Sequence, residues 1–177
     1  MADFIDELET ARHNQNTVYI IGNGGSASTA MHMANDFGMI DSKAGAGNKP
    51  FSVLSLADNS SIMTTIANDD SYEDLFVKQL QIHYRTGDKL VAISASGNSP
   101  NIIAAAEWVK KHKGKVIGLA GFDGGRLKDI CDILILTKAP KGEYGPVEDT
   151  HMILEHMITT LLQFRVKDEG SRASEVK

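Results

Sequence analysis

The chain has 177 residues, 42% hydrophobic and 23% charged, a composition typical of one globular domain and not of a disordered protein. Its formal net charge of -5 argues against a nucleic-acid partner, although backbone N–H groups and hydroxyls can still bind an anion. The one cysteine, Cys131, excludes an internal disulfide and fits a reducing, cytoplasmic location. The acidic N-terminus is no signal peptide, and no apolar run approaches the roughly 18 residues of a membrane helix, so no membrane partner is expected.

Hydrophobic runs alternate with helical stretches along the chain. Five short apolar runs predict buried strands, at Thr17–Ile21, Ser52–Leu56, Lys89–Ile93, Lys115–Leu119 and Ile133–Leu136. Helices are predicted at a short N-terminal segment and at about 28–40, 60–67, 72–84, 100–113, 126–130 and 147–167. The alternation predicts an α/β fold: one domain over residues 1–177, with a five-stranded parallel sheet between two helical layers. Two further loops are predicted at Asp41–Pro50 and Lys138–Pro146, and a frayed tail at Ser171–Lys177.

The loops after the first and third strands are the candidate binding sites, because ligands of parallel sheets lie beyond the carboxyl ends of the strands. The first loop, GNGGSAS at 22–28, contains Asn23, Gly24 and Ser26. Its glycines allow close approach of a ligand, and Ser26 or Ser28 can cap the following helix. A tight strand-to-helix turn explains the pattern equally well. The loop matches neither the dinucleotide fingerprint nor the Walker motif, so no nucleotide cofactor is expected.

The second loop, Ser94–Pro100, has three hydroxyls within six residues, on Ser94, Ser96 and Ser99. Pro100 suits the first position of a helix and Ser99 its cap. A simple capped turn needs one serine and not three. We therefore interpret this loop as a phosphate site that uses hydroxyl and N–H donors without a full positive charge.

Two groups of acid–base residues lie on the helices that flank these loops. His32 and Asp36 are four residues apart and share one helix face. The last helix contains five more within nine residues: Glu148, Asp149, His151, Glu155 and His156. A lone histidine on an apolar helix is more often a core residue, but two such groups beside a phosphate loop favour a functional site. Their spacing also permits a divalent metal such as Zn²⁺, with His and carboxylate ligands from two helices.

Four motifs together resemble the sugar isomerase (SIS) domain of phosphoheptose isomerases: GNGGSAS with Ala30–His32, IAND at Ile66–Asp69, ISASGNSPN at Ile93–Asn101, and KVIGLAGFDGG at Lys115–Gly125. The matches run in order from about Val18 to Leu162. The resemblance implies a flavodoxin-like sheet and a homotetramer with active sites between subunits. It also implies a sugar phosphate substrate, sedoheptulose 7-phosphate, converted to a heptose 7-phosphate for surface polysaccharide.

The resemblance implies roles for individual residues. Ser94, Ser96 and Ser99 would hold the phosphate, and Asn23, Gly24 and Ser26 would contact the sugar. Asp69 would lie near the reacting end, together with Asp58. His156 would be an acid–base group, and the metal ligands, if a metal is used, would be His32, Asp36, Glu148 and His156.

Two positions depart from the family pattern. Asp36 stands where phosphoheptose isomerases have the catalytic Glu, and Glu148 stands where they have a Gln. The Asp carboxylate is shorter by about one methylene, and a base misplaced by about 1 Å can cost on the order of a hundredfold in rate. Glu148 can compensate as a base or as a metal ligand, which leaves the exact sugar phosphate open. The short N-terminal helix also leaves dimer and tetramer open.

The hypothesis is therefore an aldose–ketose isomerase that moves a proton through an enediol. Asp36 or Glu148 would remove the proton next to the carbonyl, and His156 would transfer protons. Two alternatives stay open. One is an isomerase of a different sugar phosphate. The other is a binding or docking protein without chemistry, like the relative that associates with the bacterial replication initiator, although such a protein need not keep His156 and its acidic neighbours.

Overall fold

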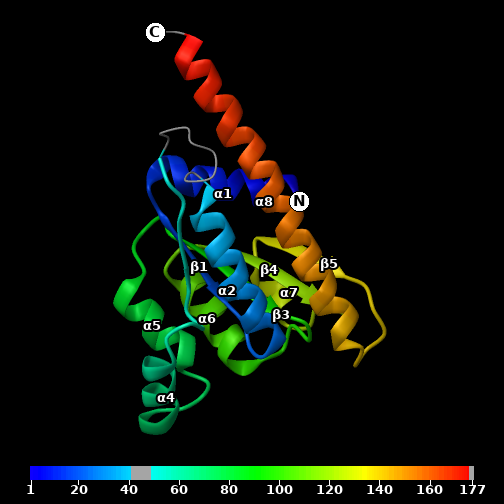
Figure 1. Cartoon of the computed structure of the whole chain (residues 1–177). Helices are drawn as coiled ribbons and strands as arrows, with labels where there is room; N and C mark the ends of the chain where they lie inside the picture. Colours follow the sequence, from blue (N-terminus) through cyan, green and yellow to red (C-terminus); the bar gives the residue numbers. More distant parts are fainter. Residues whose placement is uncertain (41–48, 176–177) are drawn as a thin grey trace.

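The computed structural model describes residues 1–40 and 49–175, so most of the predicted loop Asp41–Pro50 lies outside the described residues. Within them the strands are β1 (Thr17–Ile21), β2 (Ser52–Ser55), β3 (Lys89–Ser94), β4 (Lys115–Gly121) and β5 (Ile133–Thr137). The helices are α1 (Ala2–Asn14), α2 (Gly25–Gly38), α4 (Ser60–Asp69), α5 (Leu75–His83), α6 (Pro100–Lys111), α7 (Leu127–Ile130) and α8 (Tyr144–Glu175). All five predicted strands are confirmed (Figure 1).

The strands form one parallel sheet in the order β2-β1-β3-β4-β5. The chain passes from β1 to β2 on one side and then returns to pair β3 with the other side of β1. This reversal leaves a crevice at the carboxyl ends of β1 and β3, where sheets of this flavodoxin-like order bind ligands. The topology therefore brings the two candidate loops together.

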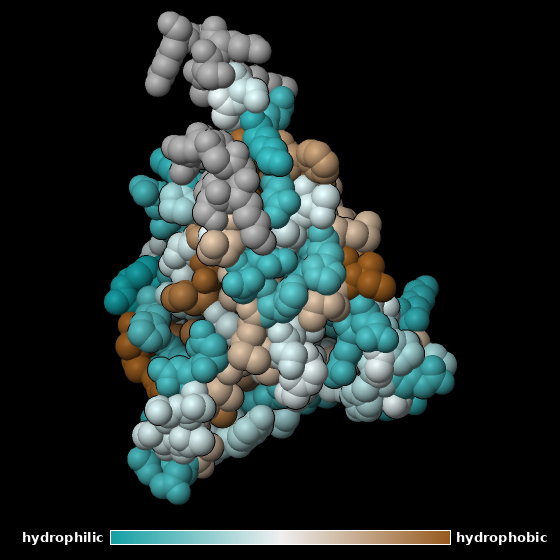
Figure 2. Space-filling view, in the orientation of Figure 1, coloured by the Kyte–Doolittle hydropathy of each residue, from teal (hydrophilic) through white to brown (hydrophobic). Residues whose placement is uncertain are grey.

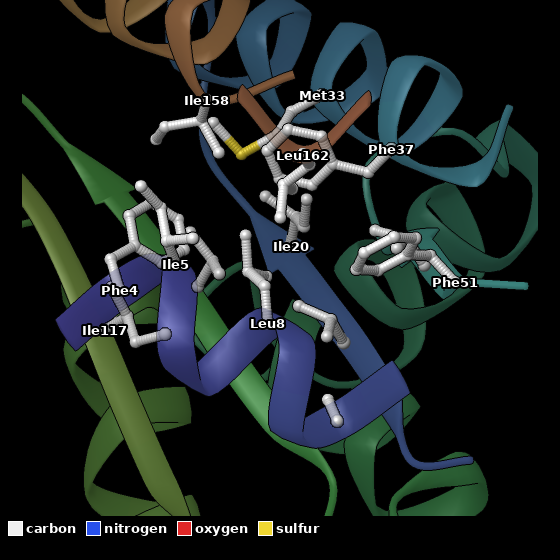
Figure 3. Packing of buried hydrophobic residues seen from close by; sticks show 14 of the residues in the cluster. Phe4, Ile5, Leu8, Ile20, Met33, Phe37, Phe51, Ile117, Ile158 and Leu162 are labelled. Atoms are coloured by element: carbon white, nitrogen blue, oxygen red, sulfur yellow. The ribbon is translucent and has the colours of Figure 1, made fainter. Parts of the chain in front are cut away.

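Helices cover both faces of the sheet because each central strand is apolar on both sides. Val18 and Ile20 of β1 point into the core formed with α1, α2 and α8, whereas Tyr19 and Ile21 point into the core formed with α5, α6 and α7. In the first core, shown in Figure 3, side chains of α2 and α8 interdigitate above the sheet, among them Met33, Phe37, Ile158 and Leu162.

The last helix is longer than its apolar pattern predicted. It begins at Tyr144 and continues to Glu175, so it enters the segment Ser171–Lys177 that was predicted as a tail, of which residues 176–177 lie outside the described residues. Ion pairs with α1 hold the polar part of the helix: Arg12 contacts Glu169 at 2.6 Å, and Arg165 pairs with Glu9. Ion pairs of this kind can extend a helix past its hydrophobic stripe. Figure 1 shows the C-terminal part of α8 projecting from the rest of the domain.

Among the helices of residues 1–40 and 49–175, none has both the length and the hydrophobicity needed to cross a bilayer.

The contact between α2 and α8 can be tested with Phe37, which is fully buried in the first core. We expect Phe37→Ala to lower the free energy of unfolding by about 3–5 kcal/mol, since the substitution leaves a cavity between the two helices. Ile82→Ala is the control, because Ile82 is 55% exposed and its truncation should cost less than about 1 kcal/mol. Urea denaturation followed by circular dichroism measures both variants, and equal losses would contradict this packing.

Candidate active site

The loop after β1 leads directly into the first turn of α2. Gly24 is the N-cap residue, with a φ of 54°, and α2 begins at Gly25. The backbone N–H groups of Ala27 and Ser28 both donate hydrogen bonds to the carbonyl oxygen of Gly24. The expectation that Ser26 or Ser28 caps this helix is therefore wrong, because both lie inside its first turn. The N-terminus of α2 presents backbone N–H groups and its positive dipole end at the crevice.

The serine loop after β3 lies beside it. Ser99 is the N-cap of α6 and Pro100 follows it, as predicted, but the Ser99 side chain makes no capping hydrogen bond. Its Oγ instead lies 3.2 Å from Oγ of Ser94, which is 4% exposed. The hydroxyl thus turns into the crevice and not along the helix.

The loop after β4 braces the serine loop. Arg126 donates its backbone N–H to Oδ1 of Asn98, and Leu127 donates its own to the carbonyl of Gly97. Gly97 has a φ of 63°, and a Cβ at this position would lie 2.0 Å from the carbonyl oxygen of Gly124. Only glycine fits here, so the two loops form one rigid wall.

A cavity of about 220 Å³ lies between the two loops. Its lining combines backbone, hydroxyl and amide groups with one carboxylate, from Asn23, Gly24, Gly25, Ser26, Ile93, Ser94, Ala95, Ser96, Ser99, Tyr144 and Glu148. Six of the seven substrate-binding residues predicted from the sequence line it. The cavity is rich in donors suited to phosphate, and the ends of two helices flank it.

Asn23 is held by a network that the sequence did not predict. Its amide exchanges two hydrogen bonds with the amide of Asn101, at 2.8 and 2.9 Å. Tyr72 donates its hydroxyl to Oδ1 of Asn23 at 3.0 Å. Tyr72 precedes α5 and Asn101 lies in the first turn of α6, so only the fold brings them to Asn23.

A second group of polar side chains lies where α2 meets α8. Nε2 of His32 is 3.1 Å from Nε2 of His156 and 3.6 Å from Oδ2 of Asp36. Oε2 of Glu155 is 3.3 Å from the ring nitrogen of His156 and 3.7 Å from that of His32. We call these four residues the His–carboxylate group. Each offers one ligand atom, and the four atoms lie within 4.8 Å of one another, so the group can hold a metal ion.

Burial differs sharply within this group. The side chains of His32 and His156 are 43% and 56% exposed, whereas Glu155 is fully buried. Burial raises the pKa of Glu155, opposed by a hydrogen bond from the Thr159 hydroxyl and by the two histidines. Burial also lowers the pKa of His151, which lies against the carbonyl of Ala120 and belongs to the core of α8.

Two predicted residues lie elsewhere. Glu148 is not part of the His–carboxylate group, because it lies seven residues, or about 10 Å of helix, before Glu155 and beside Gly25 in the cavity. The group that could hold a metal ion thus contains Glu155 and not Glu148, and the metal set predicted from the sequence stays a prediction. Asp69 ends α4, accepts a hydrogen bond from Asn68, and does not line the cavity of this chain. Asp58 lines a separate hollow beside β2.

Known proteins resemble this chain in sequence and in fold. The SIS domain model matches residues 2–121. The phosphoheptose isomerase of Aneurinibacillus thermoaerophilus is 38% identical over 85% of this chain and 73% of its own length, and phosphoheptose isomerase 2 of Campylobacter jejuni is 34% identical over 93% and 79%. This chain belongs to the phosphoheptose isomerase family. Among solved structures, the phosphoheptose isomerase of Neisseria gonorrhoeae superposes with a TM-score of 0.79 at 28% identity, covering 90% of this chain and 83% of that one.

The SIS fold also occurs in proteins of other kinds. The Vibrio vulnificus NanR protein, solved in complex with ManNAc-6P, has a TM-score of 0.65 at 18% identity and covers 99% of this chain and 58% of that one. At this identity the likeness extends to the fold alone.

The braced serine loop makes a direct prediction for this phosphoheptose isomerase family member. Gly97→Ala should weaken the binding of a sugar phosphate about tenfold or more, because the added Cβ must push Gly124 or the serine loop away. Gly38→Ala is the control, since a Cβ at Gly38 meets nothing within 4 Å. Isothermal titration calorimetry measures both affinities. Unchanged binding in Gly97→Ala would show that the loop does not form the phosphate site.

Proposed function

We propose that this protein interconverts sedoheptulose 7-phosphate and a heptose 7-phosphate, and that it works in the cytoplasm in the synthesis of surface polysaccharide. The observation that carries the proposal is the arrangement along α8. Glu148 lies in the donor-rich cavity, and His156 lies eight residues further along the same helix, in the His–carboxylate group. The phosphate and the reacting carbons are at opposite ends of a seven-carbon sugar, which such a separation of about 12 Å along the helix can accommodate.

Phosphate binding by hydroxyls and helix ends anchors the far end of the substrate. Ser94, Ser96 and Ser99 would donate to the phosphate oxygens, and the N–H groups of α2 and α6 add favourable dipoles. Asn23, fixed by Asn101 and Tyr72, would orient a sugar hydroxyl. Anchoring of this kind restricts the reacting carbons to one geometry, which converts binding energy into rate.

The reaction is a redistribution of protons with no net oxidation. A carboxylate, Asp36 or Glu148, removes a proton from C1 of the ketose while the C2 oxygen gains one, which yields an enediol. The O1 proton then leaves and C2 is protonated, so that C1 becomes the aldehyde. His156 is the proposed group for the transfers between oxygens, since its side chain is exposed and an imidazole can both donate and accept a proton.

The His–carboxylate group also fits a divalent metal such as zinc, on the chemistry of its donors and on the buried Oε2 of Glu155, which has no hydrogen-bond partner. His32, Asp36, Glu155 and His156 would hold the ion, and a bound ion supplies Lewis-acid polarisation of a carbonyl. Glu148 lies outside this group, so its carboxylate stays available for proton transfer whether or not the others bind a metal.

Solvent exchange tests the reaction. In D₂O with sedoheptulose 7-phosphate, we expect deuterium at C1 of the ketose and a new aldose signal by NMR. His156→Asn and Asp36→Asn should each lower the rate by about 10²–10⁴, the usual contribution of an acid–base group, and Glu148→Gln separates the two candidate bases. Other ketose phosphates tested in parallel would identify a different substrate. If sugar phosphates bind but no label enters in any reaction, the isomerase proposal fails and a binding or docking protein takes its place.

We further propose a homo-oligomer that forms through α8. Ile153, Met157, Leu161 and Phe164 lie on one face of the helix and are 39–63% exposed. The last three line an open apolar groove of about 430 Å³ together with His156 and Thr160. Figure 2 shows hydrophobic residues reaching the surface beside this helix. A second copy packed here would cover apolar area and close over the exposed His156, which supports an active site between subunits.

The interface prediction can be tested by charge insertion. Met157→Glu should shift the mass measured by light scattering toward the monomer, because a carboxylate would be buried in the apolar contact. Ile82→Glu, at an equally exposed position of α5, should leave the mass of the oligomer unchanged. A wild-type protein that is monomeric at all concentrations would contradict the proposed interface.

A further inference from the structure

Tyr144 lines the cavity, yet neither the sequence motifs nor the proposed reaction gives it a role. It is the first residue of α8, and Glu148 lies one helical turn later on the same face, so both side chains reach the cavity beside the serine loop. Tyr144 is 49% exposed. Among the described residues no hydrogen bond involves its hydroxyl, so this donor is available to a ligand.

Phe122 contacts the ring of Tyr144 and orients it. The two rings meet edge to face, with their centroids 5.3 Å apart and their planes at 86°. Aromatic pairs favour this geometry, because the positive edge of one ring meets the negative face of the other. Phe122 lies in the loop after β4, which also braces the serine loop, and Tyr144 follows the loop after β5. The contact therefore ties the start of α8 to the wall of the phosphate site.

The backbone of Phe122 is strained. Its φ is 57°, in the left-handed region that bulky side chains disfavour. Gln15 and Lys113 also have positive φ, but both lie at the C-terminus of a helix, where a left-handed residue is common. Phe122 instead directly follows a strand, so helix capping does not account for its conformation.

Core burial does not account for the strain either. Phe122 is only partly buried and belongs to neither of the two hydrophobic cores. Gly124 and Gly125 adopt positive φ in the same loop, and a glycine at position 122 would adopt it at less cost. A costly conformation that persists beside a ligand site points to a role of its side chain at that site. The aromatic partner of this side chain is Tyr144.

The chemistry of the cavity explains why one more donor is useful. The described residues that line it include no lysine, arginine or histidine and only one carboxylate, that of Glu148. A phosphate must therefore be bound there by neutral donors, against a negative charge in the same space. A phenol carries its proton at neutral pH and can donate a hydrogen bond to an anion.

We propose that Tyr144 donates its hydroxyl to the phosphate of the substrate, and that Phe122 is the positioning residue of the Tyr144 ring. The proposal rests on the ligand class of the proposed function, a sugar phosphate, but not on the isomerase reaction. It makes the start of α8 a third wall of the phosphate site, beside the serine loop and the first turn of α2. The strain at Phe122 then serves to fix one more neutral donor at the cavity.

Binding, and not turnover, tests this role. Isothermal titration calorimetry of the full chain measures the affinity for sedoheptulose 7-phosphate and for inorganic phosphate. Tyr144→Phe removes the hydroxyl and keeps the ring, so it should weaken both affinities about tenfold, the usual cost of a lost hydrogen bond to a charged group. A loss with inorganic phosphate assigns the contact to the phosphate and not to a sugar hydroxyl.

A second variant tests the positioning role. Phe122→Gly should weaken binding by about the same factor as Tyr144→Phe, while its Tm stays close to that of the wild type, because relief of the left-handed backbone offsets the lost ring contact. The double variant should bind no more weakly than Tyr144→Phe alone, since Phe122 acts through that hydroxyl. Lys113→Gly is the control. It relieves a φ of 59° before the amino end of β4, away from the cavity, and should keep the wild-type affinity.

The proposal is overturned if Tyr144→Phe or Phe122→Gly keeps the wild-type affinity for phosphate, or if the two losses add in the double variant. A loss confined to sedoheptulose 7-phosphate also contradicts it, because the contact would then be to a sugar hydroxyl. Deuterium exchange reports on the isomerase separately. Label with no effect of Tyr144→Phe on binding leaves the reaction standing and removes this role, whereas the expected losses without label leave this role standing.

Discussion

The packing of α2 against α8 on one face of the sheet is the contact that positions the His–carboxylate group. Met33 and Phe37 of α2 interdigitate with Ile158 and Leu162 of α8 in the buried core. His32 and Asp36 directly precede the two core residues of α2, so hydrophobic packing sets where they lie. The same register places Glu155 and His156 opposite them. The four polar side chains of the His–carboxylate group lose water and crowd one another where they meet. The apolar contacts between α2 and α8 hold them together in spite of this cost.

The order of the strands determines where the cavity lies. Because β3 pairs with β1 on the side away from β2, the loops that follow β1 and β3 open into one crevice. Neither loop contributes a full positive charge. Hydroxyls, N–H groups and two helix N-termini can bind phosphate there, while Glu148 supplies a carboxylate in the same space. This set of donors suits an anionic sugar that is held by its phosphate, while the His–carboxylate group lies further along α8.

Strong local patterns made most of the fold predictable. The five apolar runs predicted all the strands found in the described part of the chain, since a strand buried on both faces has a distinctive apolar composition. The ends of α8 were less predictable, because ion pairs with α1 extend it beyond its apolar stretch. The caps were also partly missed. Ser26 lies inside the first turn of α2, because that helix begins earlier than expected. Ser99 is the N-cap residue of α6, but its hydroxyl contacts Ser94 and not the helix.

The sequence by itself determined the α/β class and pointed to two candidate binding loops and a set of candidate acid–base residues, because strand composition, serine and glycine clusters and helical spacing are all local. It could not decide which carboxylate joins the two histidines. Glu148 and Glu155 stand on the same helix, and only the rotation and depth of α8 against α2 place Glu155 in the group and Glu148 in the cavity. Those two quantities follow from core packing between segments more than 100 residues apart, which no local pattern encodes.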